Sequence, residues 1–201
     1  MPIGKRFSGL SKGSIRNPLW GNNVTAAPVP CTLVIGAGQS NCQGWAADPA
    51  STTSMTNGYG YWFYPNTITG GVVQDGVLLP LNPMKLGRSV SGPQAPFIQT
   101  WTAGGGGPVI WVDCAAGGSS MVSTAKPALT GSGTIAISGG TWDLSDGANI
   151  YQSWCVPNVR AAMAAARDNG FMIRHVVVVW IQGEQDAGAN AQSNGPSYRT
   201  N

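Results

Sequence analysis

Three apolar runs along the chain have the pattern of buried β-strands. They cover residues 32–35, 109–115 and 172–181, and each leads into a glycine-rich or polar turn. Within each run the apolar residues follow one another without alternation, which is typical of strands covered on both faces. The third run is rich in β-branched residues and gives the clearest prediction of a strand.

Two segments between these runs have helical spacing. Residues 93–103 begin with a proline and stop at four glycines, which predicts a helix. One face of this helix carries Phe97, Ile98 and Trp101. Residues 154–168 form the second predicted helix, with a proline near its start and a glycine after its end. The apolar face of the second helix is expected to consist of Val156, Val159, Met163 and Ala166.

The order strand, helix, strand, helix, strand predicts an α/β fold: a three-layer sandwich in which helices cover both faces of a parallel sheet. The length of 201 residues suits one domain of this kind. Residues 1–30 have no sustained period and end in A-A-P-V-P. We therefore interpret them as an N-terminal arm or linker ahead of a domain at residues 31–201.

The remaining segments predict mainly loops. Residues 42–91 contain an aromatic cluster, which we expect to pack within a loop or hairpin rather than to line a carbohydrate site. The cluster consists of Tyr59, Tyr61, Trp62, Phe63 and Tyr64. Residues 126–150 are rich in glycine and threonine, with a small hairpin predicted around residues 134–137.

Charged residues make up only 9% of the chain, well below the usual quarter, which predicts a neutral surface. Such a surface is typical of a secreted or particle-bound protein, so we expect an extracellular or virion-associated location. The basic cluster of the arm is interpreted as a solvated tail, with contact to an acidic protein partner as the alternative. It consists of Lys5, Arg6, Lys12 and Arg16. The sequence has no long basic stripe of the kind that binds nucleic acid, and it has no apolar run of 18 residues that would predict a membrane span.

The four cysteines and the single histidine do not form the pattern of a zinc site, because no C-x-x-C pair occurs. Cys31 and Cys114 lie in predicted strands, where we expect buried thiols. The spacing permits a disulfide among these two and the remaining Cys42 and Cys155, but does not require one.

The stretch C-T-L-V-I-G-A-G-Q-S-N-C-Q-G-W-A, which begins at Cys31, permits two interpretations. A dinucleotide site needs G-x-G-x-x-G or A, a following helix, and an acidic residue about 20 positions on. Asn41 stands at the third small position, a glycine and a proline break the next segment, and residues 55–60 contain no acid. The sequence instead favours a nucleophile, because Ser40 stands just past the end of a buried strand.

Polar turns follow the other two strands as well, G-G-S-S after the second and Q-G-E-Q-D after the third. Since the carboxyl ends of parallel strands meet at one edge of the sheet, we expect these turns to surround Ser40. A serine nucleophile needs a base and donors for the oxyanion that forms on the substrate. Backbone N–H groups at Ser40 and in a glycine-rich turn can donate, and the carboxamide of Gln182 or Asn41 can add a third donor.

Four short blocks occur in order: G-Q-S-N at 38–41, G-P at 92–93, A-G-G-S-S at 116–120 and W-I-Q-G-E-Q-D-A at 180–187. With these blocks the chain resembles the SGNH-hydrolase superfamily, and within it the sialate O-acetylesterase and acetylxylan-esterase-like group. The resemblance covers roughly residues 31–190. It implies an SGNH/flavodoxin-like fold and a serine hydrolase acting on acetylated carbohydrate, with no metal or organic cofactor.

The resemblance also implies roles for individual residues. Ser40 matches the nucleophile, and Glu184 matches an acid that orients the histidine or the turn. The oxyanion donors would be the Ser40 N–H together with Gly92, Gln182 and Asn41. The residues that line the substrate would be Gly117, Gly118 and Ser119.

The catalytic histidine of the family lies in a D-x-x-H-like block near the end of the domain, and no such block occurs here. His175 begins the strand that leads to Gln182, which places it about 23 Å away, at the wrong edge of the sheet. We therefore expect the front part of a longer esterase, lacking its C-terminal units, or else a catalytically inactive protein. We prefer the first, because a sheet that stops at this strand has an unpaired edge. The alternative function is a structural or glycan-binding module of a phage tail, appendage or cell-surface protein.

Overall fold

A computed structural model of the 201-residue chain describes residues 27–43, 60–65, 68–69, 72–73, 76–80, 92–123, 128, 137–183 and 186. Five strands form the main sheet, in the order β5-β2-β6-β1-β9. They are β1 (Val29–Gly38), β2 (Gly60–Pro65), β5 (Gly76–Pro80), β6 (Val109–Asp113) and β9 (Phe171–Ile181). Two smaller pairs join β3 (Ile68–Thr69) to β4 (Val72–Val73) and β7 (Ala116–Gly117) to β8 (Ile137–Ser138).

Strands β2, β6, β1 and β9 run parallel, and β5 is antiparallel to β2. In the centre of the sheet Val34 of β1 pairs in register with Trp111 of β6 and Val177 of β9. All three strands predicted from the unbroken apolar runs are therefore present and parallel, which confirms the predicted α/β fold. In the described part of the chain, no helix has both the length and the apolar character needed to cross a membrane.

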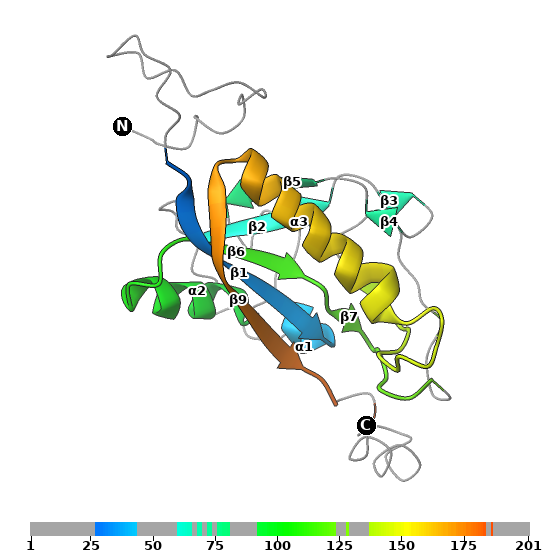
Figure 1. The fold of residues 1–201 in the computed structure, drawn as a ribbon. Coiled ribbons are helices and arrows are strands. Elements are labelled where there is room, and N and C mark those ends of the chain that lie inside the picture. The colour runs from blue at the N-terminus through cyan, green and yellow to red at the C-terminus, as the bar shows by residue number, and fades with distance from the viewer. Residues whose placement is uncertain are drawn as a thin grey trace, which may run out of the picture.

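Helices cover both faces of the sheet, so the predicted three layers are present (Figure 1). The helix α3 (Val156–Asp168), preceded by the π-helical turn η5 (Tyr151–Cys155), crosses one face. The helix α2 (Gln94–Ala103) and the short α1 (Ser40–Gln43) cover the other. Alternate residues of each strand fill the two cores, as when Leu33 faces α3 and Val34 faces α2.

The second predicted helix is present, and two residues of its predicted apolar face lie at the core: Ala166 is buried and Val159 packs against the core. Val156 is half-buried, but Met163 is 46% exposed, and the other buried residues of α3 are Asn158, Ala162 and Ala165. Small side chains let a helix approach a sheet closely, so the alanine stripe faces the core and the longer methionine points to solvent. The helical segment begins earlier than the predicted residue 154, because the η5 turn starts at Tyr151 and continues directly into α3.

The aromatic cluster belongs to a core strand, so the prediction of a loop is wrong for β2 and β5. Tyr61 and Phe63 are buried on the α3 side of β2, and Trp62 is buried on the α2 side. Because a strand buried on both faces is apolar at every position, the cluster showed no alternation. Its antiparallel pairing with β5 confirms a packed, hairpin-like arrangement, and Tyr59 lies outside the described residues.

The glycine- and threonine-rich segment at residues 126–150 is described only in part. Residues 134–136 of the hairpin predicted there lie outside the described residues, and β8 follows them, parallel to β7. Cys31 and Cys114 are buried thiols, as predicted from their strands.

The strand β9 forms one edge of the sheet, and among the described residues only β1 pairs with it. Three apolar side chains on its α3 side are largely exposed, with exposed fractions of 57% for Val176, 61% for Val178 and 44% for Trp180. The prediction that this run is covered on both faces is therefore wrong for these residues, because no described element lies over the outer part of β9.

Candidate functional site

Ser40 is the first residue of α1, two residues beyond the end of β1, and it is half-buried. The chain reaches this position through Gly38, which has a φ of +116°. A Cβ atom at Gly38 would lie 1.9 Å from the carbonyl oxygen of Ile181, so only glycine lets the ends of β1 and β9 come this close. The Gln39 N–H then donates to that same oxygen at 2.7 Å.

The turn after β6 lies beside Ser40. A Cβ atom built on Gly117 would be 3.9 Å from the Cβ of Ser40 and 3.2 Å from Oε1 of Gln43. Gly118 follows with a φ of +67°, and Ser119 is fully buried. The structure therefore brings the A-G-G-S-S block against the predicted nucleophile.

Gln39 connects all three turns at this edge of the sheet. Its side chain is only 1% exposed, and its Nε2 donates to the carbonyl oxygen of Ser119 at 2.6 Å. Its Oε1 accepts a hydrogen bond from the N–H of Gly183 at 3.1 Å. A single carboxamide next to Ser40 thus holds the turn after β6 and the turn after β9 together.

Gln182 and Asp186 form the β9 side of the site. The Gln182 Nε2 donates to the Ser119 carbonyl oxygen at 3.0 Å and to the Asp186 carboxylate at 3.2 Å. The buried Asp186 also accepts hydrogen bonds from the Ser120 hydroxyl at 2.7 Å and from the Met121 N–H at 3.2 Å. Asp186 therefore fastens the A-G-G-S-S block to the Q-G-E-Q-D block.

The indole of Trp142 reaches the same cluster from the segment before η5. Its Nε1 donates to the Ser119 hydroxyl at 3.0 Å, and this hydroxyl donates to the Gly38 carbonyl oxygen at 3.3 Å. The Trp142 ring also packs edge-on against Trp180 of β9, with centroids 4.8 Å apart. The two hydrogen bonds hold the Ser119 side chain in one orientation, and the ring contact positions the Trp142 indole.

The G-P block is held at this edge through the start of α2. Gln94 is buried, and its Nε2 donates to the Cys42 carbonyl oxygen at 2.8 Å. Gly92, two residues earlier, is half-buried. Asn41 is exposed on α1, and Glu184 lies outside the described residues.

A second nucleophile candidate, Cys42, lies two residues after Ser40 and is buried. Burial, together with the smaller effect of the negative charge of Asp113, raises the pKa of its thiol to about 12. At neutral pH the group is therefore a thiol, and thiols are weak nucleophiles compared with thiolates. The site consequently has Ser40 as its nucleophile candidate on α1.

His175 lies far from Ser40, as its position in the third apolar run predicted. It is exposed on β9 and pairs in register with Thr32, about 20 Å along the strand from Gly38. Since it is the single histidine of the chain, these 201 residues hold no histidine that could act as a base for Ser40. Among the described residues, no group of three metal-ligating side chains gathers anywhere.

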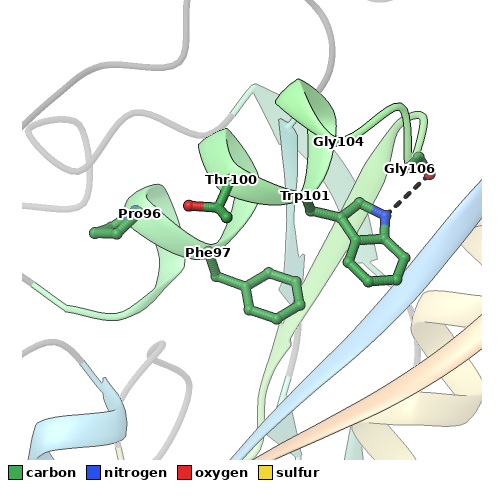
Figure 2. Close-up of a pocket in the computed structure, with 6 residues that line it drawn as sticks. All are labelled: Pro96, Phe97, Thr100, Trp101, Gly104 and Gly106. Atoms are coloured by element: carbon green, nitrogen blue, oxygen red, sulfur yellow. Dashed lines mark hydrogen bonds between the residues drawn. The ribbon is translucent and has the colours of Figure 1, made fainter.

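A separate cavity of about 580 Å³ lies along α2, lined by Pro96, Phe97, Thr100, Trp101, Gly104 and Gly106. Figure 2 shows the rings of Phe97 and Trp101 side by side, with centroids 5.9 Å apart and an interplanar angle of 11°. The Trp101 Nε1 donates to the Gly106 carbonyl oxygen at 2.9 Å. The lining contains neither a titratable group nor any predicted site residue, so this cavity is distinct from the Ser40 site.

Sequence reasoning missed the side chains that support the site. Gln39, Gln43 and Asp186 all lie within or next to the motif blocks, so the sequence contained a signal for them. What it lacked was the direction of each side chain: Gln43 points back to donate to the Ala115 carbonyl oxygen at 2.7 Å. Nothing local in the sequence indicated Trp142, which lies between the blocks.

No protein-family model matches the chain, and no curated protein matches its sequence. Its structure is similar to the crystal structure of NanS, with a TM-score of 0.52 and 18% sequence identity. The similarity covers 87% of this chain and 60% of the NanS chain, so the chain spans less than two thirds of that protein's length. At this identity the likeness concerns the fold alone: it supports the α/β fold with a parallel sheet between helices that the order of strands and helices predicted.

Proposed function

We propose that this chain carries the nucleophile of a serine esterase that removes acetyl groups from carbohydrate. The observation that carries the proposal is the position of Ser40 beside the turn that contains Gly117, at the carboxyl edge of a parallel sheet, where Gln39 ties three turns together. Chemistry in parallel α/β sheets takes place at this edge. The fold likeness to NanS and the four motif blocks support the same conclusion.

In this proposal the Ser40 hydroxyl attacks the ester carbonyl carbon, and the carbonyl oxygen becomes an oxyanion. The N–H groups of Ser40 and Gly92 would donate to that oxygen, with a carboxamide hydrogen from Gln182 or Asn41. For Gln182 this requires the oxyanion to compete with the 3.2 Å hydrogen bond from its Nε2 to Asp186, which is longer than the 3.0 Å bond from the same atom to Ser119. Water then releases acetate from the acyl-enzyme.

Two further roles in the proposed reaction are contact with the substrate and orientation of the base. Gly117 and Gly118 would line the substrate, because small residues leave room beside Ser40, whereas the fully buried Ser119 would support this turn from the core. Glu184 would orient the base or the turn after β9.

The base has to come from outside these residues. A histidine supplied by additional polypeptide, in a D-x-x-H-like block, would accept the Ser40 proton. The exposed apolar side chains of β9 support this part of the proposal, since Val176, Val178 and Trp180 would be covered by such a segment. We thus propose that the complete domain consists of residues from about 31 onward together with that additional segment.

Hydrolysis of p-nitrophenyl acetate tests the function, measured on this chain and on a longer polypeptide that includes a D-x-x-H block. We expect turnover from the longer protein, and a loss of about a thousandfold or more with Ser40→Ala. Ser145→Ala removes an exposed hydroxyl elsewhere and should leave the rate unchanged. Turnover that survives Ser40→Ala would contradict the proposed nucleophile.

The distance between His175 and Ser40 favours a second candidate, a glycan-binding module that uses an esterase-like fold without catalysis. Retention of acetylated oligosaccharide by the longer protein, with no release of acetate, would support this candidate over the esterase.

A further inference from the structure

Two cysteines that the proposed esterase chemistry does not use lie together in the core between the sheet and α3. Cys114 directly follows β6, and Cys155 is the last residue of the η5 turn, just ahead of α3. Both side chains are buried and belong to the same hydrophobic core. The pair therefore joins two elements that lie 41 positions apart in the sequence.

The two cysteines are in contact. The Cys114 thiol donates to the Cys155 carbonyl oxygen at 3.7 Å, and each thiol shifts the pKa of the other. Burial raises the pKa of Cys114 well above its ordinary value. The pKa of Cys155 is lowered instead, because the Cys114 thiol donates a hydrogen bond to its thiolate. Cys155 is thus the sulfur that ionises first and attacks a disulfide.

The other two cysteines, Cys31 and Cys42, differ from Cys155 because their thiol pKa values are raised. Burial raises the pKa of Cys31 to about 11 and that of Cys42 to about 12. Cys42 lies in the core on the opposite face of the sheet, where its thiol contacts the Val179 carbonyl oxygen at 3.7 Å. These two residues serve as internal references for the reactivity of the pair.

We propose that Cys114 and Cys155 form a disulfide under oxidising conditions. The oxidant is a small-molecule disulfide such as oxidised glutathione. The Cys155 thiolate attacks one of its sulfurs and expels a glutathione thiolate, which leaves a mixed disulfide on Cys155. The Cys114 sulfur then gives up its proton, attacks the Cys155 sulfur and expels the second glutathione thiolate. Two cysteine thiols are oxidised, one oxidant disulfide is reduced, and both protons end on the glutathione thiolates.

A disulfide requires the two sulfur atoms to approach to about 2 Å, with the Cβ atoms about 3.8 Å apart. The π-helical turn that ends at Cys155 is a wide turn, of the kind that occurs mostly as single insertions near functional sites. The bond would tie the start of α3 to the end of β6, three residues ahead of Gly117.

The disulfide has a measurable effect on stability. By the chain-entropy relation, a bridge between residues 41 positions apart raises the midpoint of thermal unfolding of a domain of this size by about 10 °C. The effect is independent of the proposed esterase, because it needs neither a substrate nor a base for Ser40.

The test equilibrates the full chain with reduced and oxidised glutathione at pH 8, both in the folded state and during refolding from urea. Free thiols are then blocked with N-ethylmaleimide in denaturant, and the peptides are mapped by mass spectrometry. We expect one disulfide, joining Cys114 to Cys155, with blocked thiols at Cys31 and Cys42. We also expect a thermal midpoint about 10 °C above that of the protein treated with dithiothreitol.

Substituted proteins sharpen the result. Cys114→Ala and Cys155→Ala should each abolish the difference in thermal midpoint between the two redox conditions, whereas Cys31→Ala should retain it. Four blocked thiols after refolding, a bond to Cys31 or Cys42, or a glutathione adduct alone would each overturn the proposal. The peptide map is read on the unsubstituted chain, so it decides the question even where a substituted protein does not fold.

Discussion

The Gln39 side chain offers a direct test of how the site is held together, through the substitution Gln39→Ala. Two buried hydrogen bonds are lost, one to the Ser119 carbonyl oxygen at 2.6 Å and one from the Gly183 N–H at 3.1 Å. The Ser119 oxygen keeps its bond from Gln182, but the Gly183 N–H loses the acceptor that Gln39 provides. Two such bonds with one donor left unsatisfied correspond to a loss of about 3 kcal/mol in the free energy of unfolding.

Urea denaturation followed by circular dichroism measures this change, with the m-value checked for equality between the proteins. Gln99→Ala is the matched control, because Gln99 is an exposed residue of α2 and should change the free energy of unfolding by no more than about 0.5 kcal/mol. A loss below about 1 kcal/mol for Gln39→Ala would show that the three turns do not depend on this carboxamide.

The isosteric substitution Gln39→Glu separates hydrogen bonding from packing. It keeps an acceptor for the Gly183 N–H but turns an oxygen toward the Ser119 carbonyl oxygen, where Gln39 has a donor. An ionised carboxyl is disfavoured there, so its folded pKa rises, and only the protonated form can donate to the carbonyl oxygen. The protein should therefore be least stable relative to wild type at high pH, with the deficit shrinking as pH falls through the raised pKa. A deficit that does not change with pH would refute the assigned donor.

Two further predictions concern turns at and near the site. Gly38→Ala should lower the free energy of unfolding by about 3 kcal/mol or more, since its Cβ would meet the Ile181 carbonyl, whereas Gly105→Ala, at a φ of +82° with open space around it, should cost only about 1 kcal/mol in urea denaturation. Hydrogen bonds from Ser145 lower the pKa of Asp143 to about 2, so their contribution to stability is present above about pH 4 and is lost as pH falls toward 2. Ser145→Ala should raise this pKa toward 3.9 in an NMR titration of the carboxyl carbon, and an unchanged pKa would contradict the assigned cause.

The fold could be predicted where the chemistry is local. Unbroken apolar runs and helix boundaries marked by proline and glycine indicated β1, α2, β6, α3 and β9. For α3 the sequence correctly placed Val159 and Ala166 on the core side but wrongly included Met163, because the exact face depends on how closely the helix approaches the sheet. The aromatic run at β2 did not indicate a strand, because its burial depends on partners distant in the sequence, such as Trp111 of the neighbouring strand.

The site could be predicted as a set of turns but not as a network. Parallel strands bring their carboxyl ends to one edge, which is enough to place Ser40, Gly117 and Gln182 in the same region. The bonds between the turns depend on side-chain rotamers that are set only when the strands are in register. The Gln39 side chain reaches Gly183 because β1 and β9 pair up to Gly38 and Ile181, and no pattern within one segment shows this.

Most of the groups that hold the turns around Ser40 together carry no charge, which bears on how the activity of this site would depend on pH. The described turns are held by carboxamides, hydroxyls and backbone groups, and these do not titrate between pH 4 and pH 9. Asp186 is a carboxylate that joins this network, through hydrogen bonds from the Ser120 hydroxyl, the Met121 N–H and the Gln182 carboxamide. The hydrogen bonds that the uncharged groups make with one another, such as those of Gln39 to Ser119 and Gly183, should stay constant while a base titrates. A pH–rate profile of a complete esterase built on this chain would then report the pKa of the base that serves Ser40, and not a rearrangement of the turns that position it.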